Sequence, residues 1–369
     1  MKIIVAPDKF KGSLTSMQAC ECIKDGILQT NKNAEVHLFP MADGGDGFAA
    51  VMKYYLQTQT VHCKTVDPLM RDISAAYEWD DENKTAIIEL ASASGLTLLK
   101  EDERNPLKTS AYGTGLLIKH AVDKGAQKIM LGIGGSAAND AGIGILAALG
   151  FIFKDEHDEI LNPVGENLLH IKNIIPPAVR PSVEFIIACD VTNILFGKEG
   201  AAFMYAAQKG ADENAISLLD KGSKHFAAII KYKTGKDIAN FSGSGAAGGV
   251  AAGLAAYFNL QIVSGAKLIV EISGIQKQLT DAAIIITGEG RLDNQSSKGK
   301  VIHQIASMGK ALNIPVIALC GEICIEETEI KAMGLNAACS LINKYTSKEE
   351  AIKEAAALLQ LAAASLFKK

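Results

Sequence analysis

The sequence predicts an α/β protein with two domains, one of them built around a parallel sheet from the first and last thirds of the chain. Short apolar runs alternate with apolar-periodic helical segments, and glycine clusters separate several of these pairs. The chain has 369 residues, of which 48% are hydrophobic, more than one compact core usually absorbs. A central segment has the pattern of an antiparallel hairpin instead. This indicates a second, mixed α/β domain inserted between the two thirds.

Eight apolar segments have the length and composition of strands. Several are apolar on both faces, as the buried strands of a parallel sheet are. In chain order, the predicted strands are 2–6, 35–39, 85–90, 128–133, 183–189, 282–287, 314–319 and 336–342.

Two helix starts between and after these strands carry a capping box, in which a hydroxyl and a later carboxylate or amide bind otherwise unpaired N–H groups. The first pairs Thr15 with Gln18, and the second pairs Ser347 with Glu350. Apolar residues then recur at helical spacing, at 17, 20, 23 and 27 and at 352, 355, 359 and 366. A helix is therefore predicted after each box.

The segment 65–90 alternates polar and apolar residues around the polar turn 80–83, which is typical of an antiparallel hairpin. We assign it to the inserted domain. The predicted domains are residues 1–64 with 275–369, and residues 65–274.

Composition limits the possible partners. A net charge of −4, without a cluster of Lys and Arg, gives no attraction to nucleic acid. The sequence has no signal peptide and no apolar stretch of 18 residues, so we expect a cytoplasmic protein that does not bind a membrane. Seven cysteines and seven histidines lack the spacing of disulfide frameworks or transition-metal sites.

Four glycine-rich segments, 41–47, 132–142, 242–249 and 287–293, are interpreted as strand-to-helix junctions. Glycines let backbone N–H groups approach an anion, and a following helix N-terminus adds partial positive charge, so such junctions suit phosphate. Each junction alone is equally consistent with close packing of a helix on a strand.

Two of these segments keep a nicotinamide-dependent oxidoreductase open as an alternative. Residues 243–248 match GxGxxG, but a weak strand precedes them and Leu268 stands where an acidic residue is expected. Residues 132–137 fit GxGxxA after a better strand, with Asp155 loosely placed as the acid. No P-loop and no protein-kinase motif occurs.

Acidic residues stand beside the glycine-rich segments: Asp8, Asp43, Asp46, Asp140, Asp190, Glu289 and Asp293. In open α/β sheets the ligand lies at the carboxyl ends of the strands, where these carboxylates are expected. Carboxylates around phosphate-binding amides favour Mg²⁺ and a nucleotide, because Mg²⁺ is usually held by one or two carboxylates and the phosphates. For Asp46 and Asp140, helix capping is an equally good interpretation. Lys9, Lys11, Arg71 and Arg291 supply cations for a phosphate or a substrate carboxylate.

Taken together, these segments resemble the bacterial glycerate kinase family, which is unrelated to P-loop and protein kinases. The resemblance runs nearly the whole length of the chain, through APDKFKGS at 6–13, MADGGDG at 41–47, ASASGL at 91–96, NPL at 105–107, YGTG at 112–115, GGSAAND at 134–140, ACDVTN at 188–193, QKG at 208–210, GSGAAGG at 243–249 and TGEGRLDNQS at 287–296. It implies that the discontinuous domain is Rossmann-like and that the active site lies in the cleft between the domains.

The resemblance further implies transfer of the γ-phosphoryl group of ATP to glycerate, with Mg²⁺, giving 2-phosphoglycerate. We assign Asp190, Lys11 and Asp8 to catalysis, with Asp190 orienting or deprotonating the attacking hydroxyl and Lys11 neutralising phosphoryl charge. Asp43 and Glu289 are assigned to Mg²⁺, and Arg71, Arg291 and Ser94 to the substrate. The predicted phosphate-binding residues are Gly134, Gly135, Ser136, Ala137, Gly245, Gly248 and Gly249.

Four residues depart from the usual family pattern: Ala111, Ala138, Ala141 and Ala207. They replace Ser, Thr, Gly and Pro, so hydrogen bonds to ligand can differ, but every assigned acidic residue is present. A non-catalytic nucleotide-binding module is a further alternative, although it predicts lost carboxylates. The sequence does not identify the phosphorylated hydroxyl, the preferred enantiomer, the oligomeric state or the pathway.

Overall fold

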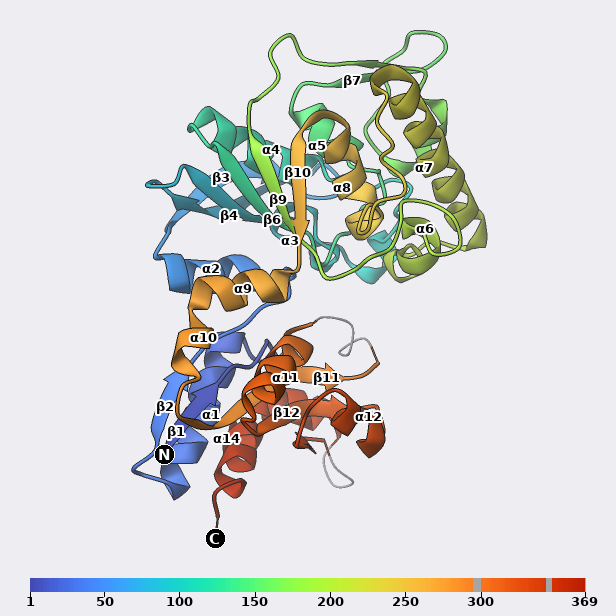
Figure 1. Ribbon diagram of the computed structural model, residues 1–369. Coiled ribbons are helices and arrows are strands. Elements are labelled where there is room, and N and C mark those ends of the chain that lie inside the picture. The colour runs from blue at the N-terminus through green and yellow to red at the C-terminus, as the bar shows by residue number, and fades with distance from the viewer. Residues whose placement is uncertain (295–299, 343–346, 369) are drawn as a thin grey trace. The chain divides into compact units, whose positions relative to one another are not determined.

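The computed structural model describes residues 1–294, 300–342 and 347–368, which fold into two compact units (Figure 1). Unit 1 consists of Met1–Asp43, Ala50–Tyr55 and Ser264–Lys369, and unit 2 of Gly44–Ala49 and Leu56–Val263. The predicted boundary at residue 64 falls inside a strand, β3 (Gln59–Val66), and the boundary at 274 falls at the end of helix α9 (Gly265–Ser273).

Unit 1 contains a sheet of five parallel strands in the order β13-β12-β11-β1-β2. The first strands of the chain therefore pair with the last ones, which confirms the predicted Rossmann-like sheet made from both ends of the chain. The elements are β1 (Lys2–Val5), α1 (Ser16–Thr30), β2 (Glu35–Leu38), α9, α10 (Ile275–Gln278), β11 (Ala282–Leu292), α11 (Val301–Leu312), β12 (Val316–Ile323), α12 (Glu327–Ala332), β13 (Ala337–Ser340), α13 (Lys348–Lys353) and α14 (Ala355–Ser365).

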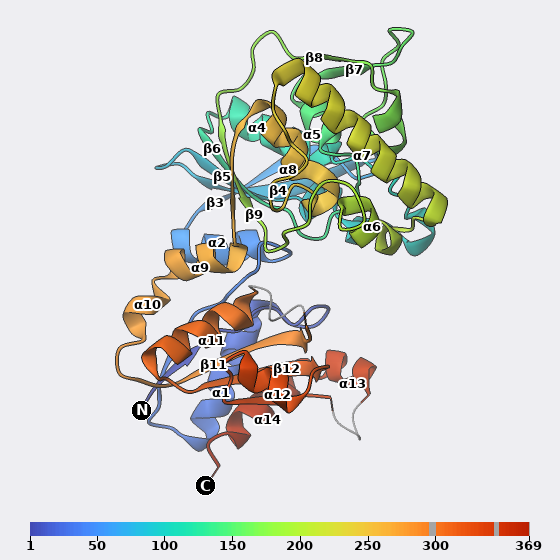
Figure 2. The same cartoon turned by 45° about the vertical axis from the view of Figure 1, so that its right-hand side comes forward.

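Both predicted capping boxes are present, at Thr15 before α1 and at Ser347 before α13. The apolar face of α1 packs with α14 over the sheet, and the two helices lie side by side in Figures 1 and 2. The predicted C-terminal helix is divided into α13 and α14 at Glu354, for which we have no physical account.

Unit 2 contains a six-stranded mixed sheet in the order β10-β9-β6-β5-β4-β3. Strands β5, β6, β9 and β10 are parallel, while β3, β4 and β5 form the predicted antiparallel arrangement. The strands are β3, β4 (Asp72–Asp80), β5 (Thr85–Glu89), β6 (Lys128–Gly132), β9 (Glu184–Ala188) and β10 (Asn259–Val263), with the separate pair β7 (Ile152–Lys154) and β8 (Asn173–Ile175). The predicted α/β class with a second mixed sheet is confirmed.

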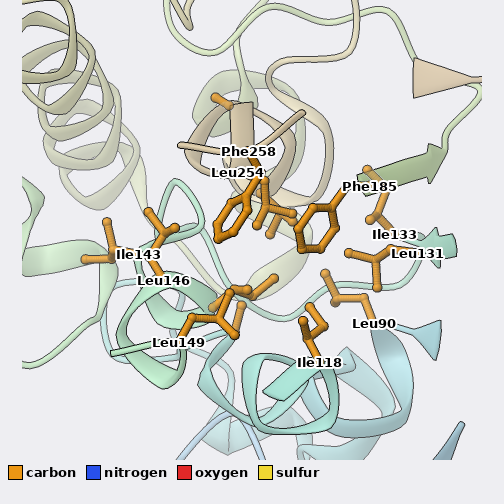
Figure 3. Packing of buried hydrophobic residues seen from close by; sticks show 14 of the residues in the cluster. Leu90, Ile118, Leu131, Ile133, Ile143, Leu146, Leu149, Phe185, Leu254 and Phe258 are labelled. Carbon is orange, nitrogen blue, oxygen red and sulfur yellow. The ribbon is translucent and has the colours of Figure 1, made fainter. Parts of the chain in front are cut away.

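Helices cover the six-stranded sheet, and the apolar core of unit 2 lies between the helices and the sheet. They are α3 (Ala91–Ser94), α4 (Tyr112–Asp123), α5 (Ile143–Ala148), α6 (Ala201–Tyr205), α7 (Glu213–Thr234) and α8 (Ala246–Tyr257), while α2 (Phe48–Leu56) has residues in both units. Figure 3 shows the core, where Leu131 and Phe185 from the sheet meet Ile118, Leu146 and Leu254 from the helices. No helix among the described residues is long and apolar enough to cross a membrane.

Two predicted strand-to-helix junctions are wrong. Residues 242–249 follow α7 and run into α8, and residues 235–245 between the two helices, all of which are described, form no strand. Residues 287–292 continue β11 beyond the predicted end at 287. The glycines keep their place in the strand because neighbours approach them closely. A Cβ on Gly288 would lie 2.1 Å from the Leu319 carbonyl oxygen, and one on Gly290 would lie 3.0 Å from the Lys11 nitrogen.

A test of the unit 1 core concerns Gly26, in the middle of α1. Alanine normally stabilises a helix interior relative to glycine by about 1 kcal/mol. Here, however, a Cβ would lie 2.2 Å from the Gln360 carbonyl oxygen of α14 and 2.9 Å from the Ala363 Cβ. We therefore expect Gly26→Ala to destabilise the protein by about 1–3 kcal/mol, measured by urea unfolding. The exposed Asp25→Ala variant of the same helix is the control, and an equal or higher stability for Gly26→Ala would contradict the close helix contact.

Candidate functional site

Three acidic residues of unit 1 come together at the carboxyl ends of β11, β1 and β2. Asp8 follows β1, Asp43 follows β2, and Glu289 lies in β11. The Asp8 N–H donates to the Gly288 carbonyl at 2.8 Å, which holds Asp8 beside β11. Lys9 lies among them, with its Nζ 3.3 Å from Asp43 Oδ1 and 3.8 Å from Asp8 Oδ1. The structure thus brings together three of the predicted residues.

The electrostatics of this group centre on Asp8, which is only 5% exposed. Burial, together with the charges of Asp43 and Glu289 and against the opposing effect of Lys9, raises the pKa of Asp8 to about 7. Because burial and the two like charges disfavour the ionised carboxyl, a bound cation would stabilise the ionised form of Asp8.

The donor set fits Mg²⁺ only in part. Among the described residues, no group of three or more His, Cys, Asp or Glu side chains is arranged to hold a metal ion. Mg²⁺ in nucleotide enzymes usually takes one or two carboxylates, with phosphate oxygens and waters as its other ligands. Asp43 and Glu289 supply two carboxylates, which agrees with that mode of binding. A site in which protein side chains alone surround the metal ion is not present among the described residues.

Two further predicted cations of unit 1, besides Lys9, extend from the same edge. Lys11 is exposed in the turn that follows Phe10, and its backbone lies against Gly290 of β11. Arg291 is more than half exposed, and its Nε lies 3.6 Å from Asp293 Oδ2. Both side chains can reach an anion without first breaking a buried contact. The last two residues of the TGEGRLDNQS segment, Gln295 and Ser296, lie outside the described residues.

In unit 2, two glycine-rich segments pack against each other at the carboxyl ends of β6 and β9. A Cβ on Gly134 would lie 2.5 Å from the Gly45 Cα, and one on Gly44 would lie 2.7 Å from the Ala188 carbonyl oxygen. Gly44 also has a φ of +84°, which favours glycine. Asp190 follows Ala188 by two residues, so it lies at the same edge of the sheet as the segment 134–140.

Internal hydrogen bonds narrow the set of N–H groups that this loop can offer to a phosphate. The Ala137 N–H donates to the Ser94 carbonyl at 2.9 Å, and the Ala138 N–H donates to Ser136 Oγ at 3.1 Å. The Gly134 N–H donates to the Gly44 carbonyl at 3.3 Å. Among the predicted phosphate-binding residues 134–137, all of which the structure describes, this leaves the N–H groups of Gly135 and Ser136 available to a ligand.

The second predicted phosphate loop packs tightly on the first. A Cβ on Gly248 would lie 2.3 Å from the Ala138 carbonyl oxygen, and one on Gly245 would lie 2.0 Å from the Ile194 carbonyl oxygen. Gly248 and Gly249 both have positive φ, of +71° and +92°. Close packing therefore accounts for these glycines by itself, and their role in phosphate binding stays a prediction.

Two predicted substrate residues make other contacts. Ser94 is fully buried, and its hydroxyl accepts a hydrogen bond from Thr114 Oγ1 at 2.7 Å. Arg71 lies in the turn between β3 and β4, where it pairs with Asp67 and, at 2.6 Å, with Glu103. Either residue would have to exchange these contacts to bind substrate.

Three buried polar residues lie in the first loop or against it. The sequence left Asp140 open between a helix cap and a functional carboxylate, and gave Asn139 and Lys209 no site role. The Asp140 carboxylate accepts from the N–H groups of Ala111, Gly142 and Gly144, as a helix cap does. Lys209 is 3% exposed and donates to the Ala138 carbonyl. The Asn139 side chain is fully buried, with no hydrogen-bond partner for Nδ2 or Oδ1 among the described residues. The QKG segment carried no signal that its lysine is buried.

Of the four departures from the family pattern, three are fully buried: Ala111, Ala138 and Ala141. Ala141 adopts a φ of +49°, a backbone conformation that favours glycine. Ala207 is exposed at the start of the short helix η4 (Ala207–Lys209).

Comparison with known proteins agrees with this arrangement. The family model described as the glycerate kinase family matches residues 3–369. The chain is 39% identical to the glycerate kinase of Halalkalibacterium halodurans, over 99% of this chain and 97% of that protein. It is 35% identical to the glycerate 2-kinase of Escherichia coli, over 96% and 94% of the two chains.

A solved structure shows the same fold. The crystal structure of a protein assigned as glycerate kinase 2 from Salmonella typhimurium LT2 superimposes with a TM-score of 0.84 at 35% sequence identity, covering 100% of this chain and 97% of that chain. These relatives give no support to a nicotinamide-dependent oxidoreductase. The protein is therefore an enzyme of the glycerate kinase family.

Proposed function

We propose that this protein transfers the γ-phosphoryl group of ATP to a hydroxyl of glycerate, with Mg²⁺ as the cofactor, in the cytoplasm. The observation that carries the proposal is the full-length match to the glycerate kinase family. The carboxylate group of unit 1 and the glycine-rich loops of unit 2 support it, because phosphoryl transfer depends on charge neutralisation and positioning. That the residues of the two units act together stays a prediction.

In unit 2, the N–H groups of Gly135 and Ser136 are our candidates for binding a phosphate group of ATP, since the neighbouring N–H groups already bond within the protein. Asp190 is the candidate that orients the attacking glycerate hydroxyl and accepts its proton. Its place after β9 supports this role, because ligands of parallel sheets bind at the carboxyl ends of the strands.

In unit 1, Asp43 and Glu289 would hold Mg²⁺, which neutralises phosphate charge when bound. Asp8 lies beside both and would share in this negative site. Lys11 would contact the transferred phosphoryl group, and Arg291 would bind the carboxylate of glycerate. Arg71 and Ser94 are weaker candidates for the substrate because of their present partners.

The product is expected to be 2-phosphoglycerate. The observation behind this expectation is the similarity to a protein named glycerate 2-kinase. Incubation with ATP, Mg²⁺ and D- or L-glycerate, followed by ³¹P NMR, identifies both the product and the preferred enantiomer. A spectrum with 3-phosphoglycerate alone would contradict the position but not the kinase activity. If no ADP forms with either enantiomer, the proposed reaction is wrong.

A further inference from the structure

Lys209 is buried beneath the loop 134–140 of unit 2. It ends η4 and precedes Gly210, whose φ of +94° turns the chain away. The Lys209 side chain is 3% exposed, and its Nζ donates to the Ala138 carbonyl oxygen at 2.6 Å. The charge that acts on this ammonium belongs to Asp140, which follows in the same loop.

This ammonium group is costly to bury. Burial lowers the pKa of Lys209 to about 8, although the charge of Asp140 opposes the shift. A buried ion pair can often be replaced as a whole by apolar residues, whereas removal of one partner leaves the other charge uncompensated. Lys209 balances the charge of the buried Asp140, and the direct hydrogen bond of its Nζ is to the Ala138 carbonyl of the loop.

The contact of Lys209 is one of several that fix the carbonyl groups of the loop. Ser136 Oγ also donates to the Ala138 carbonyl, at 3.2 Å. The buried Thr109 Oγ1 donates to the Ala137 carbonyl at 2.9 Å. The Leu96 N–H donates to the Gly135 carbonyl at 2.8 Å. Since the C=O and N–H groups of a trans peptide point in opposite directions, the bond to the Gly135 carbonyl also sets where the Ser136 N–H points. The bonds to the Ala137 and Ala138 carbonyls hold the following part of the loop in place.

We propose that Lys209 is a positioning residue for phosphate binding. Through the Ala138 carbonyl, its ammonium holds the loop 134–140 in the conformation that presents the Gly135 and Ser136 N–H groups to a phosphate of the nucleotide. Lys209 acts through the loop and is not a catalytic residue. The inference rests on the proposed function for its ligand, while the effect on loop order does not depend on that ligand.

The test compares Lys209→Met with Lys224→Met, which replaces an exposed lysine of α7. Hydrogen exchange measured by mass spectrometry reports loop order without a ligand, and calorimetry with Mg·ADP reports phosphate binding. For Lys209→Met we expect the peptide that contains residues 134–140 to exchange at least tenfold faster. The Kd for Mg·ADP and the KM for ATP should rise about tenfold, with the KM for glycerate within twofold of wild type. The control should match wild type in all of these.

Thr109→Val removes the parallel bond to the Ala137 carbonyl at nearly constant volume, and it should shift exchange and ADP affinity in the same direction. Wild-type exchange in Lys209→Met would overturn the proposal, and so would an unchanged Kd for Mg·ADP. A Lys209→Met protein that fails to fold would also overturn it, because the lysine would then serve the fold and not the loop. If wild type makes no phosphoglycerate but binds Mg·ADP and the variant shows both shifts, only the proposed reaction fails.

Discussion

Replacement of Asp190 by Asn should lower kcat by about 10²–10⁴ while leaving the affinity for Mg·ADP near that of wild type. Asn keeps the shape and one acceptor oxygen, but it has no negative charge and does not take up the hydroxyl proton. Asp190 follows β9 at the same edge of the sheet as the Gly44–Gly45 and Gly134–Ala137 segments, where a substrate hydroxyl is expected. The loss should therefore affect the chemical step more than nucleotide binding.

The measurement separates three roles of Asp190. A general base predicts a lower kcat at unchanged Mg²⁺ requirement, whereas a metal ligand predicts that activity needs more Mg²⁺. If proton removal is unimportant before a dissociative transition state, the loss is smaller and mainly orientational. Asp123→Asn, which changes an exposed carboxylate paired with Lys119 in the same unit, is the control. A folded Asp190→Asn protein with wild-type kcat, KM for glycerate and Mg²⁺ dependence would remove Asp190 from the active site.

The sheets were the most predictable part of the fold, because apolar runs of strand length between polar or glycine-rich segments leave few alternatives to a buried strand. All eight predicted strands are present, including the β11 and β1 pairing that joins the two ends of the chain. Strands β7 and β8 were missed because three residues are too few for a pattern. Strand β10 was missed because it is a half-exposed edge strand with Asn and Gln among its five residues.

The glycine-rich segments show what the sequence leaves undecided. Glycine indicates either a turn or a close approach, and only the packed structure separates the two. At Gly288 and Gly290 the close approach occurs inside a strand, so the predicted junction was wrong. At Gly135 and Ser136 the surrounding hydrogen bonds define which N–H groups remain for a ligand. This selection depends on partners such as Ser94, which lies about forty residues earlier in the chain.

The grouping of acidic residues in unit 1 was predictable in kind, since carboxyl ends of parallel strands meet at one edge. The raised pKa of Asp8 was not predictable, because the burial of Asp8 depends on how the loop after β1 folds onto β11. The same limit applies to Lys209, which is charged and polar in sequence but buried in the structure. Neither burial leaves a periodic pattern that a sequence could reveal.

Replacement of Asp8 by Asn should abolish most activity and yet stabilise the protein at alkaline pH. The variant would lack one of the three carboxylates of the group formed by Asp8, Asp43 and Glu289. We therefore expect kcat to fall by at least about a hundredfold. Burial, together with the charges of Asp43 and Glu289, raises the pKa of Asp8 from 3.8 to about 7 in the folded protein. The folded state therefore disfavours the ionised form, a cost that Asn avoids.

The sign of the pH dependence follows from the two pKa values of Asp8. Below 3.8 the carboxyl is protonated in both states and has little effect on stability. Between 3.8 and about 7 the unfolded chain loses its proton first, so wild-type stability falls as the pH rises, by about 4 kcal/mol in total. Asp8→Asn should thus melt several degrees above wild type at pH 8, with the difference disappearing near pH 4. The control Asp25→Asn, at an exposed position, should show no such trend. Equal melting temperatures for Asp8→Asn and wild type at pH 8 would mean that the ionisation of Asp8 does not destabilise the folded protein.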